Sequence, residues 1–539
     1  MTLWFAEETF TDEERARLTP HFTNLEGPVF ALTNLPEVVK GALFARYSRT
    51  TKSLRRLFLD EFADQLATGH APGAEGVKVD AAERLYERVF IEYGDDSVAQ
   101  LGGFHLACEQ ASQLLAKILE RGRLAAYLEQ STRYLRYDDR PGGRLRLTVP
   151  PELEGGRLGE RYVAYAERTF AAYGRMFDPL YAYFRERFPQ DPADPDPVYR
   201  ATITAKTCDT LRLLLPAGTR SNLGIYASGQ SYEQSLLRMR AHPLAEVREY
   251  ADRMLVELRK VIPAFLKRVD LEDRGVAWSN YLEATREASA AVAARFTEGV
   301  EPGPREMVTL TDYDPLGEEK VIAAALYAHA DLPDDRLQSL AHTMSEAERT
   351  EVLRAAIGDR ANRRHKPGRA FERTSYRFDV LCDYGAFRDL QRHRPLTIEW
   401  QRLSPRHGYE TPPQVADAGL DGDWHAAMEE SAHEWGEIAG EAGLDVAQYA
   451  VAMAYRVRFS MQMTAREAMH LIELRSSPQG HPTYRRVAQE MHRLIATTAG
   501  HRAIAASMTH ISHEDVDLER LEAERGGCAP GGAPGGAMG

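Results

Sequence analysis

The run QRHRPLTIEWQRLSPRHGY, residues 391–409, is the part of the sequence that says most about the fold of this chain. It opens with Arg392-His393-Arg394, and further arginines follow within the same run. Cations placed so close together repel one another unless anions or carboxylates neutralise them. Planar guanidinium groups suit phosphate and carboxylate. The run therefore indicates either a site for a phosphate-bearing cofactor or nucleotide, or a solvated, salt-bridged face.

A second arginine-rich stretch, RGRLAAYLEQSTRY, occupies residues 121–134 of the first half. In both halves a charged segment comes first, an arginine-rich loop follows, and a late helix closes the series. The late segments are RMRAHPLAEVREYA (residues 238–251) and MTAREAMHLIELRSSPQGHPTYR (residues 463–485). The shared order indicates two diverged copies of one unit.

The most marked break between the halves is TEGVEPGPREM, residues 297–307, which holds two prolines and two glycines. We therefore predict a first domain over residues 1–275, a linker over 276–305 and a second domain over 306–515. Residues 516–539 are rich in Gly, Ala and Pro, and we expect a flexible tail there.

Hydrophobic periodicity predicts mostly helices. Two apolar series have helical spacing, namely Ala107, Ala111, Leu114, Leu115 and Ile118 in the first half, and Ala465, Met469 and Ile472 in the second. Short alternating runs at 144–150 (RLRLTVP) and 375–381 (SYRFDVL) predict strands. The expected fold class is a helix-rich α+β protein.

The late helix of the second half carries Arg466 and Arg475. Nine residues at about 100° each place the two side chains on nearly opposite faces of the helix. The sequence Ser476-Ser477-Pro478 predicts that the helix ends at Arg475. The two arginines are thus expected to serve different pockets or different parts of one long ligand, although ordinary surface arginines would fit the same pattern.

The composition and the absence of several sequence motifs argue against a number of functional classes. The net charge of −13 over 539 residues disfavours general binding to nucleic acid or to an anionic membrane surface. The four cysteines form no CxxC pair, and the histidines lack HExxH spacing, so no metal site is expected. No P-loop motif is present, and Ser131 has no evident general base beside it in the sequence. Without a signal sequence or a long apolar run, a cytoplasmic protein is expected.

Taken together, these motifs resemble the flavin-dependent thymidylate synthases. The resemblance covers about residues 25–270 and 305–500. Its quoted stretches are RGRLAAYLEQSTRY, LRLLLP (residues 211–216), VTLTDYDPLGEEKVIAAALY (308–327), FERTSYRFDVLCDYGAFRDLQRHR (371–394) and MTAREAMHLIELR (463–475). It implies two tandem copies of that family's α+β fold.

Neither copy keeps the whole family signature. In the first copy Gly122, Ala126 and Leu128 replace signature residues, and Asp95 and Gln100 stand near the upstream positions of a family His and Glu. In the second copy the loop is two residues longer, Arg402 stands where the signature has Glu, and Gln448 stands where the first copy has Arg212.

The resemblance implies two sets of binding residues. For the flavin it implies Glu372, Arg392, His393, Arg394 and Arg466. For the deoxyuridine nucleotide it implies Glu129, Ser131, Arg133 and Arg212 of the first copy with Arg392 and Arg475 of the second. Ser131, Arg133 and Arg475 are the implied catalytic residues. Because the losses in the two copies are complementary, a working site is expected to combine both.

The implied reaction is the reductive methylation of dUMP to dTMP, with FAD as cofactor and with methylenetetrahydrofolate and NADPH as co-substrates. Since the family is tetrameric, a fused pair is expected to form a homodimer that acts as a pseudo-tetramer. Two alternatives stay open. One is a diverged, non-catalytic protein that binds a flavin or a nucleotide, and the other is a different flavoenzyme acting on another nucleotide or a folate.

Overall fold

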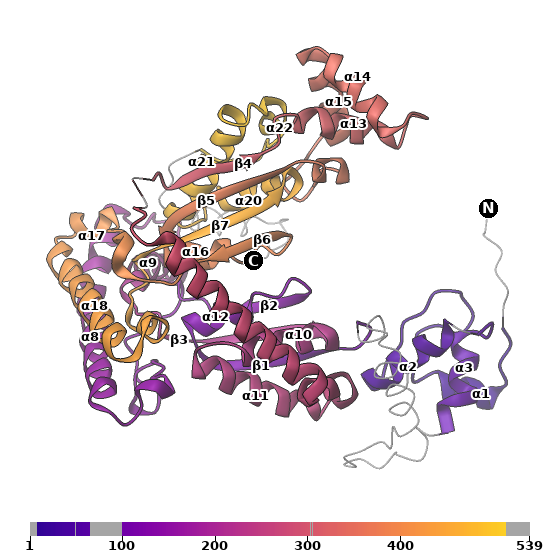
Figure 1. Ribbon diagram of the computed structural model, residues 1–539, viewed down its shortest axis with the longest axis horizontal. Helices are drawn as coiled ribbons and strands as arrows, with labels where there is room; N and C mark the ends of the chain where they lie inside the picture. The colour runs from indigo at the N-terminus through magenta and orange to yellow at the C-terminus, as the bar shows by residue number, and fades with distance from the viewer. Residues whose placement is uncertain (1–7, 49, 65–99, 302, 304, 514–539) are drawn as a thin grey trace. The chain divides into compact units, whose positions relative to one another are not determined.

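The structure is a computed structural model that describes residues 8–48, 50–64, 100–301, 303 and 305–513 (Figure 1). The chain forms two compact units. The first comprises Met1–Glu109, Leu124–Glu129 and Asn222–Glu298, and the second comprises Gln110–Arg123, Gln130–Ser221 and Gly299–Gly539. The second unit therefore holds segments of both predicted domains. The predicted tail, 516–539, and Asp95 lie outside the described residues.

The three-stranded sheet has the order β1-β3-β2. Its strands are β1 (Gly103–Ser112), β2 (Ala125–Glu129) and β3 (Arg220–Ser228). Strands β2 and β3 are antiparallel, with Ala125 opposite Ala227 and Glu129 opposite Leu223. The described helices of the first unit are α1 (Asp12–Leu18), α2 (Glu37–Tyr47), α3 (Leu54–Glu61), α10 (Gly229–Arg240), α11 (Ala245–Arg259), η5 (Pro263–Asp270), η6 (Glu272–Val276) and α12 (Ala277–Thr297).

The four-stranded sheet lies in the second unit and has the order β4-β5-β7-β6. Its strands are β4 (Val308–Tyr313), β5 (Ser375–Asp383), β6 (Leu396–Trp400) and β7 (Arg456–Thr464), and neighbouring strands are antiparallel. Every second residue of β7 is buried, from Val457 to Met463, so one face of the sheet packs against the core. The strand predicted at 375–381 is confirmed as part of β5.

The helices of the second unit are drawn from both halves of the sequence. From the first half come α7 (Gln113–Leu119), η2 (Pro141–Gly143), η3 (Pro151–Leu153), α8 (Arg157–Arg187), α9 (Asp196–Leu211) and η4 (Arg212–Leu214). From the second half come α13 (Gly317–Tyr327), α14 (Asp334–Thr343), α15 (Glu346–Ile357), η7 (Arg369–Glu372), α16 (Tyr384–Leu390), η8 (Pro405–His407), α17 (Pro413–Asp417), α18 (Asp421–Ala442), α19 (Leu444–Ala447), η9 (Gln448–Ala450), α20 (Ala465–Arg475), α21 (Pro482–Thr497) and α22 (Arg502–Ala506).

The order of elements repeats between the halves. The series β1, α7, β2, α8, α9, η4, β3, α10, α11 matches β5, α16, β6, α18, α19, η9, β7, α20, α21. The turns that follow η4 and η9 also pair directly. Ala217 and Gly218 donate their backbone N–H groups to Val451 O (2.8 Å) and Tyr449 O (2.9 Å). In return Met453 donates to Leu215 O at 2.9 Å, so the two copies join through backbone within the second unit.

Two predictions of secondary structure were wrong. The helix predicted from Ala107 to Ile118 is a strand, β1, up to Ser112 and a helix, α7, only from Gln113. In the strand Ala107 is exposed and Ala111 is buried, so the two do not share the predicted buried face, and the positive φ of Gln110 (58°) interrupts the alternation between them. The predicted strand at 144–150 makes only one isolated bridge, Leu147 to Thr219. Pro150, which has no N–H group to donate, prevents the pairing from continuing beyond the segment.

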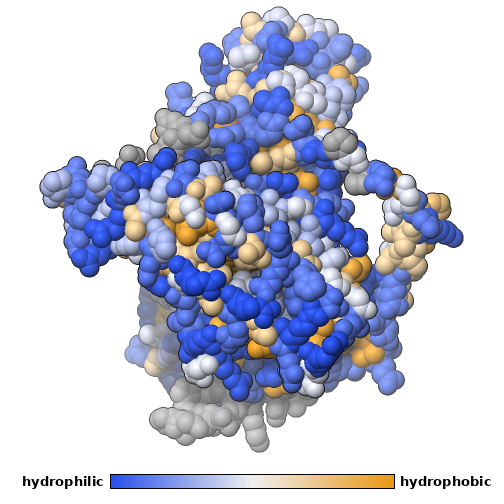
Figure 2. All heavy atoms as spheres, turned by 90° about the vertical axis from the view of Figure 1, so that its left-hand side faces the viewer, coloured by the Kyte–Doolittle hydropathy of each residue, from blue (hydrophilic) through white to orange (hydrophobic). Residues whose placement is uncertain are grey.

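Most of the segment predicted as a linker, 276–305, is the 21-residue helix α12, whose residues are all exposed or only partly buried. The face turned to the viewer in Figure 2 is the left-hand side of Figure 1, where α8 and α18 lie, and it is mostly hydrophilic with small separate hydrophobic areas. Over the described residues, no helix combines the length and the apolar character that crossing a bilayer requires.

Candidate functional site

Asp389 lies at the centre of the candidate site, in the last turn of α16. The Asp383 side chain caps this helix by accepting from Ala386 N at 2.8 Å, which fixes where the helix starts. Asp389 Oδ1 lies 3.6 Å from Arg392 Nη1, and its Oδ2 lies 3.6 Å from Arg212 Nη2. Arg212 belongs to the first half of the sequence and Arg392 to the second, so the second unit brings both halves to one carboxylate.

Asp209 is the second carboxylate of the site. Its Oδ1 lies 3.0 Å from Arg212 Nε and 3.0 Å from Arg133 Nε. Burial acts to raise the pKa of Asp209, but Arg133 and Arg212 hold that pKa down at about 2. Burial likewise acts to raise the pKa of Asp389, and the surrounding arginines, including Arg475, hold it well below its ordinary value. Both aspartates are therefore ionised at neutral pH.

The loop after β2 contributes Ser131 and Arg133. The hydroxyl of Ser131 accepts from Arg133 N at 3.2 Å, which forms a tight turn. The Arg133 guanidinium then reaches the second half of the chain, donating to Gln479 O at 3.2 Å and to the Tyr484 hydroxyl at 3.4 Å. Arg475 lies over the ring of that same tyrosine, 5.5 Å from its centroid. Tyr484 thus joins two of the predicted nucleotide-binding arginines.

We call this group of charges the arginine cluster. Four arginines act on Asp389, namely Arg133, Arg212, Arg392 and Arg475, while the carboxylates among these groups are Asp209 and Asp389. Burial lowers the pKa of Arg475, and the nearby Arg392 lowers it further. Guanidinium groups gathered in a largely buried setting suit an anion such as a phosphate monoester.

His393 connects the arginine cluster to α20. Arg475 Nε donates to His393 Nε2 at 3.0 Å, and His393 Nδ1 lies 3.0 Å from Glu467 Oε1. Because Nε2 is an acceptor, the ring proton of neutral His393 must be on Nδ1, where it is donated to Glu467. Burial, together with Arg475, lowers the pKa of His393 well below its ordinary value, so the ring is neutral at physiological pH.

A second group of charges lies at the other end of α20. Arg466 donates to Pro367 O at 2.9 Å and lies 3.4 Å from Glu372 Oε1. The same carboxylate lies 3.2 Å from Arg369 Nε. Lys366 and Arg363 act on the neighbouring His470, whose pKa burial and these cations lower to about 4. Lys366 and Arg466 also act on Glu467, so four cations face the two carboxyl groups of Glu372 and Glu467. Such a donor set fits a diphosphate-bearing group.

The ring nitrogens of His393 and His470 and a carboxylate oxygen of Glu467 lie within 4.8 Å of one another, close enough to share a metal ion. However, Lys366, Arg363, Arg475 and Arg466 all act electrostatically on His470. A further cation would be repelled by these four, so we assign the group to hydrogen bonding.

The structure brings together Ser131, Arg133, Arg212, Arg392, His393 and Arg475, all in the second unit. Glu372 and Arg466 form their own pair, and Arg394 is partly buried just before β6. Glu129 is buried at the end of β2 in the first unit. The predicted end of the late helix at Arg475 is confirmed, with Ser476 as its C-terminal cap.

Sequence reasoning missed four polar residues of the site: Asp209, Asp389, His481 and Tyr484. A signal for the aspartates was present, because each stands three residues before an arginine, Arg212 or Arg392. This spacing places a carboxylate and a guanidinium on one helical face. No comparable signal marks Tyr484, since only the fold brings it to Arg133.

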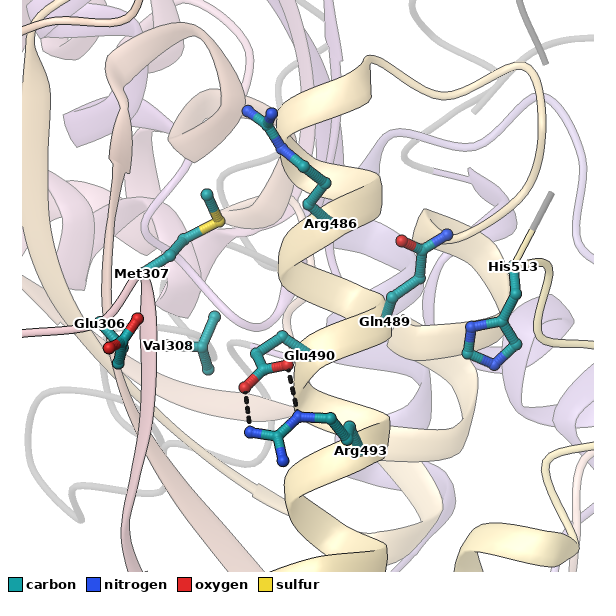
Figure 3. A pocket seen from close by; sticks show the side chains of 8 residues that line it. All are labelled: Glu306, Met307, Val308, Arg486, Gln489, Glu490, Arg493 and His513. Carbon is teal, nitrogen blue, oxygen red and sulfur yellow. Dashed lines mark hydrogen bonds and ion pairs between the residues drawn. The ribbon is translucent and has the colours of Figure 1, made fainter. Parts of the chain in front are cut away.

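A separate cavity of about 500 Å³ lies between the start of β4 and α21. Figure 3 shows its lining side chains, with Arg486, Gln489, Glu490 and Arg493 on one helix and Met307 and Val308 opposite. Glu490 accepts two hydrogen bonds from Arg493, at 2.8 and 2.5 Å, so these opposite charges neutralise each other. None of the predicted site residues lines this cavity.

The family described as thymidylate synthase complementing protein matches the chain twice, over residues 43–264 and 309–499. A UPF0159 protein of Chlamydia muridarum is 36% identical over 525 residues, which cover 96% of this chain and 98% of that protein. A UPF0159 protein of Thermoplasma acidophilum is 30% identical, covering 90% of this chain and 97% of its own length.

A flavin-dependent thymidylate synthase of Clostridium tetani is 24% identical over 202 residues, which cover 36% of this chain and 75% of that enzyme. Among solved structures, the flavin-dependent thymidylate synthase of Helicobacter pylori complexed with FAD and dUMP matches with a TM-score of 0.28 at 16% identity. That match covers 38% of this chain and all of the other.

Proposed function

Since the chain belongs to the thymidylate synthase complementing protein family, we propose that it catalyses the reductive methylation of dUMP to dTMP. In this proposal FAD is the cofactor, and methylenetetrahydrofolate and NADPH are co-substrates. The observation that carries the proposal is the arginine cluster, in which four arginines from both halves of the chain surround two carboxylates.

The arginine cluster would hold the nucleotide. Arg133, Arg212 and Arg475 would donate to the phosphate and to the pyrimidine oxygens, and Asp209 and Asp389 keep the guanidinium groups in place. Arginines near the ring oxygens would also stabilise negative charge that develops on the pyrimidine during the reaction. The Ser131 hydroxyl, fixed by Arg133 N, would contribute a further polar contact.

The flavin would be held by Glu372, Arg392, His393, Arg394 and Arg466. The surplus of cations around Arg466 and His470 fits the diphosphate of FAD. When bound, the flavin supplies the hydride chemistry that side chains cannot perform. This chain would bind and orient the partners, with His393 neutral and its tautomer fixed by Arg475 and Glu467.

The proposal is tested by titration and by turnover. We expect FAD to bind with a Kd on the order of 1 µM or below, NADPH oxidation to depend on dUMP, and dTMP to form when methylenetetrahydrofolate is added. Arg133→Ala should weaken dUMP binding by about 2–5 kcal/mol, because it leaves Asp209 short of a buried partner. Arg168→Ala, which removes a more exposed arginine paired with Glu430, is the matched control and should leave dUMP binding unchanged.

Two other results would redirect the assignment. Saturable FAD or dUMP binding without turnover would favour a non-catalytic protein of the same family, which the replacements at Gly122, Leu128 and Arg402 favour. Dependence of NADPH oxidation on dUMP without dTMP would point to another one-carbon donor. A protein that binds neither ligand would refute the proposal.

A further inference from the structure

A cavity of about 600 Å³ lies beside the arginine-rich loop of the second half, apart from the residues assigned above. Its lining comes from three elements, namely the loop that ends in η8, helix α18 and the start of α19. The lining residues are Gln401, Arg402, Leu403, Ser404, Arg406, His407, Trp435 and Leu444. We call it the second-loop pocket. It is a suitable size for a small ligand, and the lining contains no carboxylate.

The loop of this pocket is the counterpart of the loop that carries Ser131 and Arg133. Each loop follows a short edge strand, β2 or β6, and precedes a long helix, α8 or α18. Ser404 and Arg406 have the same separation as Ser131 and Arg133. The residue types that bind a nucleotide in the proposed function are thus present a second time.

The two loops are anchored differently. In the first copy Asp209 and Arg212 hold Arg133 within the arginine cluster. In the second copy the corresponding residues are Asp445 and Gln448, which also stand three apart. Asp445 pairs with Arg402 at 2.7 Å, and Gln448 Oε1 accepts from Leu403 N at 3.0 Å. The backbone on one side of Ser404 is therefore fixed without the help of Arg406.

This anchoring leaves positive charge in the pocket. In the described part of the chain, Arg406 has no carboxylate partner, and its guanidinium lies 5.5 Å from the centre of the Trp435 ring. His407 lies beside it, and burial together with Arg458 and Arg406 lowers the pKa of that histidine. The indole N–H of Trp435 is buried, and no acceptor for it occurs among the described residues.

A cation next to an aromatic ring, with a serine hydroxyl close by, suits a ligand with a flat ring and an anionic group. We propose that the second-loop pocket is a second binding site for a pyrimidine deoxynucleoside monophosphate, separate from the arginine cluster. The phosphate would be bound by Arg406 and Ser404, and the base would lie near Trp435. This assignment rests on the proposed function, because the counterpart loop identifies the ligand class.

The test uses the full chain and dTMP as the probe in isothermal titration. The double variant Arg133→Ala/Arg475→Ala disables the arginine cluster, and we expect it to retain one dTMP per chain. Adding Arg406→Ala or Trp435→Leu should weaken this remaining binding at least tenfold, whereas Arg168→Ala should not change it. Thymidine, which lacks the phosphate, and inorganic phosphate, which lacks the base, should each bind at least tenfold more weakly than dTMP.

Wild-type protein gives an independent measurement, since its titration should show two classes of site and Arg406→Ala should remove one. Binding that depends on Arg406 but not on Arg133 would support the second site and refute the first. Binding that depends on Arg133 alone, or that Arg406→Ala and Trp435→Leu leave unchanged, would overturn the second site. Far-ultraviolet circular dichroism and Arg406→Lys, which keeps the charge, separate loss of binding from loss of folding.

Discussion

At the scale of single residues, His481 couples the arginine cluster to pH. Its ring is buried, accepts from Thr483 N at 3.3 Å and begins α21. Burial lowers its pKa to about 4, with Arg212 and Arg133 acting in the same direction and Asp209 opposing them. Between pH 4 and its ordinary pKa of 6.5, the unfolded chain therefore binds a proton that the folded chain does not.

The free energy of unfolding should fall as pH decreases through that window, by on the order of 3 kcal/mol from this residue alone. His481→Asn keeps an acceptor that can cap the helix but removes the titrating ring. The slope of its unfolding free energy against pH should therefore be smaller than that of wild type, by the equivalent of about one proton. Urea unfolding from pH 4.5 to 7.5 measures the difference. The exposed His329→Asn is the control, and equal slopes for wild type and His481→Asn would contradict the prediction.

The same scale shows what the sequence could and could not predict about the site. The arginines could be predicted because they stand close together in motifs that can be recognised from the sequence alone. Asp389 and Asp209 were recognisable in principle from their spacing to Arg392 and Arg212. Tyr484 was not, because its partner Arg133 is 351 residues away and only the tertiary fold brings them together.

At the scale of elements, the two arginines of α20 lie in different surroundings, which agrees with their predicted positions on nearly opposite faces of the helix. Arg466 faces Pro367 and Glu372 near its start, whereas Arg475 faces His393 and Tyr484 at its end. Arg466→Ala should therefore weaken FAD binding, and Arg475→Ala should weaken dUMP binding, each by about 1.5–3 kcal/mol. Flavin fluorescence and calorimetry measure the two affinities, with Arg493→Ala of α21 as the control. Equal loss of both ligands in both variants would refute this division.

Helices and strands were predicted correctly where the spacing of the apolar residues fitted only the helical period or only the strand period. In α20 the apolar residues Ala465, Met469 and Ile472 fit only a helix, and the prediction is confirmed. At Ala107 and Ala111 the helical spacing was misleading, because the segment pairs with β3 as a strand in which Ala107 is exposed and Ala111 is buried. Sequence reasoning weighs local pattern, whereas the sheet is decided by partners far along the chain.

At the scale of the whole molecule, the arginine cluster combines residues of both halves within one chain and one unit. A chain with Arg133→Ala mixed with a chain with Arg475→Ala should therefore recover no dUMP binding at the arginine cluster on reassembly, beyond the binding that each variant shows alone. The measurement is calorimetry on an equimolar mixture that has been unfolded and refolded together, with wild type treated in the same way as the control. Recovery of about a quarter of the sites or more would mean that the halves meet between chains.

The backbone pairing of the turns at 213–218 and 449–454 also bears on how the site forms in a dilute solution. Two separate polypeptides would have to collide before such turns could bond, so their union would weaken as the protein is diluted. When both turns belong to one chain, they meet by closure of a loop and not by collision. The effective concentration of one turn near the other is then in the millimolar range for a short flexible connection, and it falls as the connection lengthens. Assembly of the arginine cluster should accordingly proceed at a rate that does not depend on protein concentration.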